Sequence, residues 1–264
     1  MFKTTILGAA VLASLVSAAP ASAVITTFAV FTPTTQAHNV RWVNNAVGKT
    51  STVNNSQTGS GGYFYTIATP TSNGPGIAKV NFEFLQLPAL GMLGANFFMD
   101  VSVINTPALS VSGILIQQVM NGSFSFKSQN AFTVGATTYA AGSNLLTGTY
   151  VNASIVGAGS SGSFAGNNTV PGSSLSYTSD VLSFGALDDT DFSLSLTSVT
   201  QAFFRRNAAT SLRSFRATSG GAFSSDPAPT PPVPEPEMWA MMVVGFGLIG
   251  VQVRRRARRT SVAA

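Results

Sequence analysis

Apolar and small polar residues alternate along most of this 264-residue chain, and the alternation limits what the chain can fold into. A two-residue period places every second side chain on the same face, which is typical of a half-buried β-strand. Turn-forming clusters such as NNSQTGSGG, TSNGPG and GSSGSFAGNN separate the runs. About ten or more such strands predict an all-β fold, an antiparallel β-sandwich. The clearest runs are Val24–Phe31, Gly61–Ala68, Ala78–Leu87, Ala95–Ile104, Gly122–Ser128, Ser174–Phe184 and Asp191–Phe204, and only Leu87–Gly94 suits a turn or two of helix.

The first 23 residues have the pattern of a secretory signal. Lys3 supplies a positive start, residues 6–16 form an apolar core, and Ala21 and Ala23 occupy the small-residue positions that signal peptidase accepts. The core is too short for a lasting membrane anchor, and a buried N-terminal helix is the alternative. We therefore expect signal peptidase to cleave after Ala23. The β domain would then start at residue 24, and we expect it to extend to residue 223.

Charge and cysteine content exclude several classes of function. Between Val24 and Asp226 lie eight basic and seven acidic residues, so the basic character of the chain belongs to its C-terminus. A nucleic-acid partner requires a basic face on the domain itself, and we therefore expect none. The chain has no cysteine, which excludes thiol nucleophiles, cysteine-ligated zinc and iron–sulfur clusters.

The composition changes at Ser224. Residues 224–237 hold six prolines and predict an extended linker of the polyproline type. Residues 238–253 form an almost unbroken apolar run, which predicts a transmembrane helix, slightly short for the hydrocarbon core. Residues 254–264 form a basic tail with Arg254, Arg255, Arg256, Arg258 and Arg259, which the positive-inside rule places in the cytoplasm. A buried core helix followed by a solvated basic tail is the alternative.

The same C-terminal residues carry a resemblance to a known family. The stretch VPEPEMWAMMVVGFGLIG, residues 233–250, followed by arginines, resembles the PEP-CTERM sorting signal in its Trp-Ala-Met-Met variant. The ending ARRTSVAA is longer than the usual arginine stop. The resemblance covers about 30 residues. It implies that exosortase, a membrane enzyme of diderm bacteria, recognises Pro234, Glu235 and Pro236 beside Trp239 and Ala240, and removes the helix and the arginines.

Two further motifs have both a functional and a structural interpretation. Gly157–Gly162 matches GxGxxG, but no helix pattern follows, which favours a glycine-rich hairpin loop over a dinucleotide site. Asp188, Asp189 and Asp191 lie on an expected turn. Their oxygens suit Ca²⁺ or, as a carboxylate pair, glycosidic cleavage, and an Asp-rich turn that satisfies its own backbone is the plainer interpretation.

The single histidine and four arginines are the remaining charged candidates for a functional site. His38 is the only histidine, so a histidine metal cluster is excluded, and a Ser-His-Asp triad lacks its G-x-S-x-G elbow. Four arginines, expected at the ends of a hairpin, suit either an anionic polysaccharide or headgroup, or an edge protected against strand addition. They are Arg205, Arg206, Arg213 and Arg216.

These observations lead to one expected function and two alternatives. We expect a non-enzymatic exported protein without catalytic residues, metal or cofactor, anchored in the inner membrane with its C-terminus inside before processing. It would then reach the periplasm, the outer surface or the extracellular matrix, and the resemblance implies an association with exopolysaccharide or biofilm. A carbohydrate-binding module or surface adhesin is the first alternative. A saccharide-cleaving enzyme, with Glu83, Asp100 or Asp180 converging in a cleft, is the second.

Overall fold

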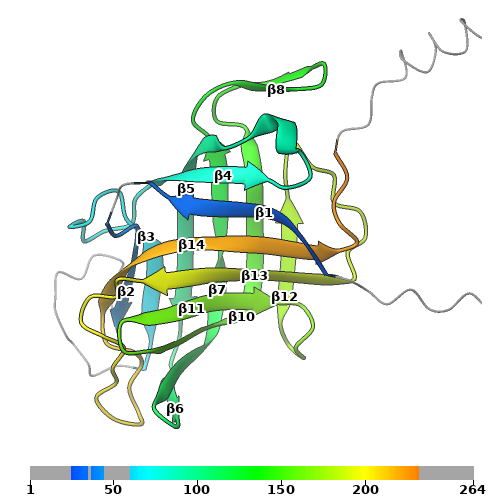
Figure 1. The fold of residues 1–264 in the computed structure, drawn as a ribbon. Helices are drawn as coiled ribbons and strands as arrows, with labels where there is room; N and C mark the ends of the chain where they lie inside the picture. The colour runs from blue at the N-terminus through cyan, green and yellow to red at the C-terminus, as the bar shows by residue number, and fades with distance from the viewer. Residues whose placement is uncertain (1–24, 35–36, 45–59, 232–264) are drawn as a thin grey trace, which may run out of the picture.

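The computed structural model describes residues 25–34, 37–44 and 60–231 (Figure 1). Within these residues the chain forms fourteen β-strands and one short 3₁₀-helix, which confirms the prediction of an antiparallel all-β domain. The elements are β1 (Thr26–Pro33), β2 (Val40–Asn44), β3 (Gly62–Thr66), β4 (Ala78–Phe84), η1 (Pro88–Leu90), β5 (Leu93–Val103), β6 (Leu109–Val111), β7 (Ile114–Ser128), β8 (Phe132–Val134), β9 (Thr137–Tyr139), β10 (Asn144–Ala158), β11 (Ser161–Asn167), β12 (Ser174–Thr178), β13 (Asp189–Thr197) and β14 (Phe215–Asp226).

Twelve strands form one antiparallel sheet in the order β1-β4-β5-β3-β2-β14-β13-β11-β10-β7-β6, with β12 paired to β10. The strands β8 and β9 form a separate hairpin. In Figure 1, β4, β1, β14 and β13 run side by side, and β5 and β7 cross behind them. The domain thus has two packed layers, as a sandwich does, but both belong to one continuous sheet.

The layers are continuous because long strands change partners along their length. The strand β14 pairs with β2 through residues 215–217 and with β1 through residues 221–225. Likewise, β5 pairs with β4 through residues 93–97 and with β3 through residues 100–103. A strand that changes partners in this way leads from one layer into the other, as at the corners of orthogonally packed sheets.

Phenylalanine side chains fill the space between the layers. Phe31, Phe82, Phe97, Phe126 and Phe223 come from five different strands and are all buried. The rings of Phe97 and Phe126 stack with centroids 4.6 Å apart, and Phe31 and Phe82 lie 4.9 and 5.0 Å from Phe126. Each fully buried side chain of this kind contributes roughly 1.5–3 kcal/mol. Aromatic packing therefore supplies stability that this cysteine-free domain cannot take from disulfides.

The first and last strands of the described domain lie side by side. Thr26 of β1 pairs with Ser225 of β14, and Ser183 forms a bridge with Thr230. The linker expected from residue 224 therefore starts later, because β14 continues to Asp226 between β1 and β13. Proline lacks the N–H that a strand ladder needs, and the first proline of this segment is Pro227.

Several expected segments lie outside the described residues. They are the signal peptide (1–23) with its cleavage-site residues Ala21 and Ala23, the later part of the linker (232–237), the transmembrane helix (238–253) and the basic tail (254–264). No helix within residues 25–34, 37–44 and 60–231 is long and apolar enough to cross a membrane.

Candidate functional site

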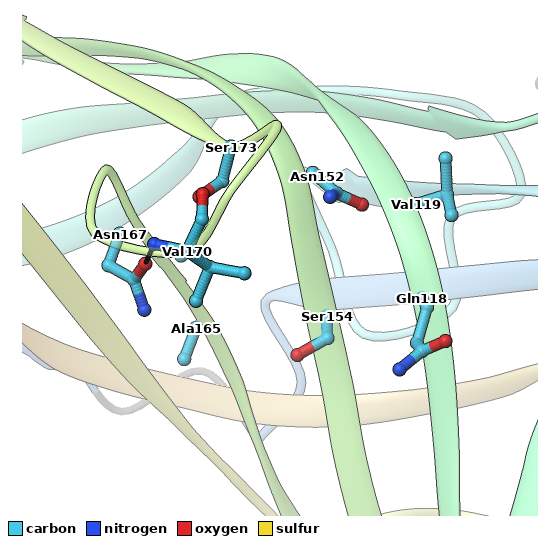
Figure 2. A pocket seen from close by; sticks show the side chains of 9 residues that line it. Gln118, Val119, Asn152, Ser154, Ala165, Asn167, Val170 and Ser173 are labelled. Carbon is cyan, nitrogen blue, oxygen red and sulfur yellow. Dashed lines mark hydrogen bonds between the residues drawn. The ribbon is translucent and has the colours of Figure 1, made fainter.

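A groove opens on the outer face of the sheet, where β7, β10 and β11 lie side by side. Figure 2 shows Gln118 and Ser154 on neighbouring strands at one side of the groove, with Asn167 and Val170 at the other. The groove has a volume of about 430 Å³, which lies within the roughly 300–1,000 Å³ of small-molecule sites.

Two opposed β-bulges create the floor of this groove. Between Tyr150 and Ala153, β10 carries one residue more than the facing part of β7. Directly beyond, between Gln117 and Met120, β7 carries one residue more than β10. Each bulge exchanges the faces on which later side chains point, and bulges of this kind are common beside functional sites.

Each bulge contains a residue in the left-handed region of backbone space. Val119 has φ +59° and Asn152 has φ +68°. Asparagine tolerates this conformation, whereas a β-branched residue there is an outlier that costs on the order of 1–3 kcal/mol. The Asn152 N–H donates to the side-chain oxygen of Asn121 at 2.8 Å, which fixes the β10 bulge. The groove is therefore a locally strained part of the sheet.

The opposite wall of the groove is held by its own hydrogen bonds. The Asn167 side-chain oxygen accepts from the N–H groups of Thr169 and Val170 at 3.2 and 3.1 Å, the second of which is drawn in Figure 2. The Ser173 hydroxyl and N–H both donate to the Val170 carbonyl. This turn places the half-exposed Val170 side chain, 51% accessible, over the groove.

The groove carries no formal charge. Its lining consists of amide, hydroxyl and small aliphatic groups, without Asp, Glu, Lys, Arg or His. The side chains of Gln118, Asn152 and Ser154 make no hydrogen bond within the part of the chain that the structure describes. These three groups can therefore donate to or accept from a ligand without breaking an internal bond.

A second cluster of polar groups lies at the 71–73 loop. Arg41 of β2 and Arg216 of β14 are paired in register, and both guanidinium groups donate to the side-chain oxygen of Asn73, at 2.6 and 2.9 Å. Tyr65 donates to the Asn73 carbonyl at 2.7 Å. Arg41 is buried, and this burial lowers its pKa, an effect that Tyr65 opposes. The cluster holds the loop against the sheet, so its arginines have a structural role.

The sequence predicted that the remaining arginines lie at the ends of a hairpin, and this prediction is wrong. Arg205, Arg206 and Arg213 lie in the irregular segment between β13 and β14. Arg205 donates to the Ala108 carbonyl, and the Arg213 N–H donates to the Phe204 carbonyl. This segment forms turns and bends without a strand, so no hairpin forms between these arginines.

The GxGxxG match forms a hairpin turn between β10 and β11, which confirms the prediction of a glycine-rich hairpin loop. Gly157 and Gly162 are opposed residues of β10 and β11, and Gly159 at the turn has φ +58°. A Cβ at Gly157 would lie 2.4 Å from the Phe203 ring, and one at Gly162 would lie 2.8 Å from it. A side chain at either position would therefore clash with the Phe203 ring, which requires glycine at both.

The aspartates expected on a turn lie mainly in a strand. Asp189 and Asp191 belong to β13, and the Asp188 N–H donates to the Asp226 carbonyl at 2.8 Å. The reason is that the alternation of buried and more exposed residues in β13 already starts at Asp189 and Thr190, before Phe192. Within the described ranges, no group of three or more His, Asp or Glu is placed to hold a metal ion.

The three acidic residues and the histidine that were candidates for catalysis lie on different elements or loops. Glu83 of β4 pairs with Val30 of β1, and Asp100 of β5 pairs with Tyr65 of β3. The Asp180 carboxylate accepts the Asn144 N–H at 2.7 Å. A His38 ring nitrogen lies 3.2 Å from the Ser198 carbonyl.

Aromatic platforms for sugar rings are limited in the described residues. Trp42 is fully buried and donates to the Leu212 carbonyl at 2.8 Å. Tyr65, Tyr150 and Tyr177 are buried, and Tyr63 and Tyr139 are half-buried. Stacking of a saccharide on Trp or Tyr is therefore limited on this part of the molecule.

The C-terminal residues 232–257 match the family model of the PEP-CTERM protein-sorting motif. The chain carries a PEP-CTERM sorting motif. This confirms the resemblance found in the sequence, and the PEP-CTERM motif marks an exported, membrane-anchored protein that exosortase processes. Its expected recognition residues, Pro234, Glu235, Pro236, Trp239 and Ala240, and the five arginines lie outside the described residues. No curated protein and no solved structure matches the chain.

Sequence reasoning missed the groove residues. The buried positions change parity along both strands, but the residues of β7 do not reveal this change, because the buried Gln117 is polar and the exposed Ile114 is apolar. In β7 the buried positions pass from Leu115 and Gln117 to Met120 and Phe124. In β10 the change falls between Tyr150 and Ala153. A change of parity inside one apolar run indicates a bulge.

Proposed function

We propose that this protein is a non-enzymatic component of the bacterial envelope or extracellular matrix that associates with polysaccharide after exosortase has processed it. The PEP-CTERM motif at residues 232–257 is the observation that carries the proposal. The domain adjoining the motif is self-contained, because its core is closed by twelve paired strands. Its first and last strands, β1 and β14, are paired with each other, and the two terminal segments begin beyond these strands in the sequence. Removal of the two terminal segments would therefore leave the domain intact.

The surface chemistry supports the association with polysaccharide. On β13, the exposed positions are Ser193, Ser195 and Thr197, and the groove adds neutral amides and hydroxyls. Such groups form hydrogen bonds with uncharged hydroxyl-rich polymers. The same groove supports the second candidate, a carbohydrate-binding adhesin, which differs in having a defined ligand site.

The mass of the mature protein tests the processing step. In cells with active exosortase, we expect a species that starts at Val24 and has lost the arginines from Arg254 onward. Glu235→Ala should retain every residue through Ala264, because Glu235 lies between the two prolines of the recognition element and outside the apolar run. Glu237→Ala is the matched control, since it removes a neighbouring carboxylate outside the Pro-Glu-Pro triplet, and it should be processed as wild type.

Two results would contradict this proposal. Wild-type protein that keeps its five arginines in such cells would make the tail a permanent anchor. Mature protein that is recovered free of the polysaccharide fraction would remove the proposed association. Replacing the five arginines with Gln provides a separate test of anchoring, because each arginine costs about 2.5–3.5 kcal/mol at the bilayer centre. That variant should lose its fixed orientation while its recognition residues are unchanged.

A further inference from the structure

We propose that the groove between β7, β10 and the 167–173 turn binds a short stretch of neutral polysaccharide through Gln118, Asn152 and Ser154. The inference rests on the proposed association with polysaccharide, and it assigns the residues that make the contact. Its basis is the combination of free polar groups, exposed aliphatic groups and absent charge in one cavity of about 430 Å³.

The free polar groups match the chemistry of sugar hydroxyls. A primary amide offers two donors and one carbonyl acceptor, and a hydroxyl both donates and accepts. Gln118, Asn152 and Ser154 hold these groups without an internal hydrogen bond within the described residues. Adjacent sugar hydroxyls also donate and accept, so they can pair with both atoms of one amide. In contrast, Asn167 and Ser173 are engaged in the turn and shape the wall.

The aliphatic groups provide a surface for the C–H faces of a sugar. Val119 and Val170 are 42% and 51% exposed, and both line the groove. Val119 is held there by the left-handed backbone of its bulge. Because the strain is borne by the folded sheet, the site is arranged before the ligand arrives, which reduces the entropy lost on binding.

The absence of charge decides between neutral and acidic polymers. An acidic polysaccharide would require Arg or Lys in the cavity, and none lines it. Arg41 and Arg216 lie outside this lining, and both are engaged by the Asn73 loop. Binding in the groove should therefore be insensitive to salt, because salt screens only interactions between charges.

Affinity electrophoresis of the mature protein tests this site. The gels would contain dextran, mannan or laminarin as neutral probes and alginate as an acidic probe. We expect at least one neutral polymer to retard wild-type protein, equally at low and high salt. Gln118→Ala and Asn152→Gly should each weaken that binding about fivefold, the effect of one lost hydrogen bond. Glycine preserves the left-handed backbone at position 152, so this variant removes the amide without disturbing the bulge.

Gln86→Ala is the matched control, because Gln86 lies between β4 and η1, outside the groove. It should bind as wild type. The inference is overturned if no neutral polymer retards the protein, if the groove variants bind as tightly as Gln86→Ala, or if alginate binds best and is released by salt. The mass measurement on the tail is independent of these gels. Failure of processing with intact groove binding would therefore reject the proposed function alone, and normal processing with unchanged groove variants would reject the groove alone.

Discussion

The interior between the two layers and the groove on the outer face are built from the same strands in opposite ways. In the interior, β7 follows strict alternation, and Phe124 and Phe126 both pack against the Phe223 ring of β14. At the groove, the same strand breaks its alternation, and Val119 is exposed with a left-handed backbone. The difference indicates that the aromatic core supplies the stability, which allows a strained site to persist at its surface.

The largest expected effect comes from removing an interior ring. Phe126→Ala should lower the free energy of unfolding by about 3–5 kcal/mol, because the cavity would lie among Phe31, Phe82 and Phe97. Urea unfolding followed by circular dichroism would measure it. Phe98→Ala is the control, since Phe98 is 37% exposed on the other face of β5, and it should cost about 1 kcal/mol. Equal losses in the two variants would contradict an interior dominated by the aromatic core.

Much of this interior could be predicted from the sequence. The alternating run Ala95–Ile104 predicted a strand because a period of two has one structural meaning, and β5 confirms it. In the run Ser174–Phe184 the prediction was too long, since only Ser174–Thr178 forms a strand. The continuity of the two layers could not be predicted in this way, since it depends on partner changes such as that of β14 between Ala217 and Gly221. Those changes are set by contacts distant in sequence, and a local pattern does not record them.

The sorting motif and the groove differ in the same respect. The motif was recognisable because the residues from Pro234 to Arg256 lie in one linear stretch. The groove joins residues from β7 with residues from β10 and the turn after Asn167, more than thirty positions away. The changes of buried parity at Val119 and Asn152 mark each bulge in the structure, and their pairing across the two strands appears in the register.

A smaller expected effect concerns the tyrosines of the interior at alkaline pH. Burial raises the pKa of Tyr150 and of Tyr177 well above the ordinary value. The folded state therefore keeps these protons after the unfolded chain loses them at about pH 10. Stability should be fully present below that pH and fall above it, by up to about 1.4 kcal/mol per pH unit for each tyrosine. Urea titrations from neutral to alkaline pH would measure the slope.

The two phenylalanine variants separate ionisation from hydrogen bonding. Tyr150→Phe and Tyr177→Phe should both flatten the alkaline slope. At neutral pH, Tyr177→Phe should cost about 0.5–1.5 kcal/mol, because Tyr177 donates to the Asp191 carbonyl. Tyr150→Phe should cost almost nothing, since its buried hydroxyl finds no partner in the described residues. An unchanged alkaline slope in both variants would show that these side chains are already solvated in the folded state.

The smallest expected effect tests the strain of the groove itself. Val119 and Val151 lie on the paired strands β7 and β10 and are 42% and 43% exposed, but only Val119 has a left-handed φ. Val151→Gly should lower the free energy of unfolding by roughly 1 kcal/mol, because glycine loses more backbone entropy on folding. In Val119→Gly the same loss is offset by about 1–2 kcal/mol of relieved strain, so its stability should stay equal or rise slightly. Equal losses in the two variants would mean that the bulge stores no strain. The proposed contrast between a relaxed interior and a strained outer face at Val119 would then be wrong.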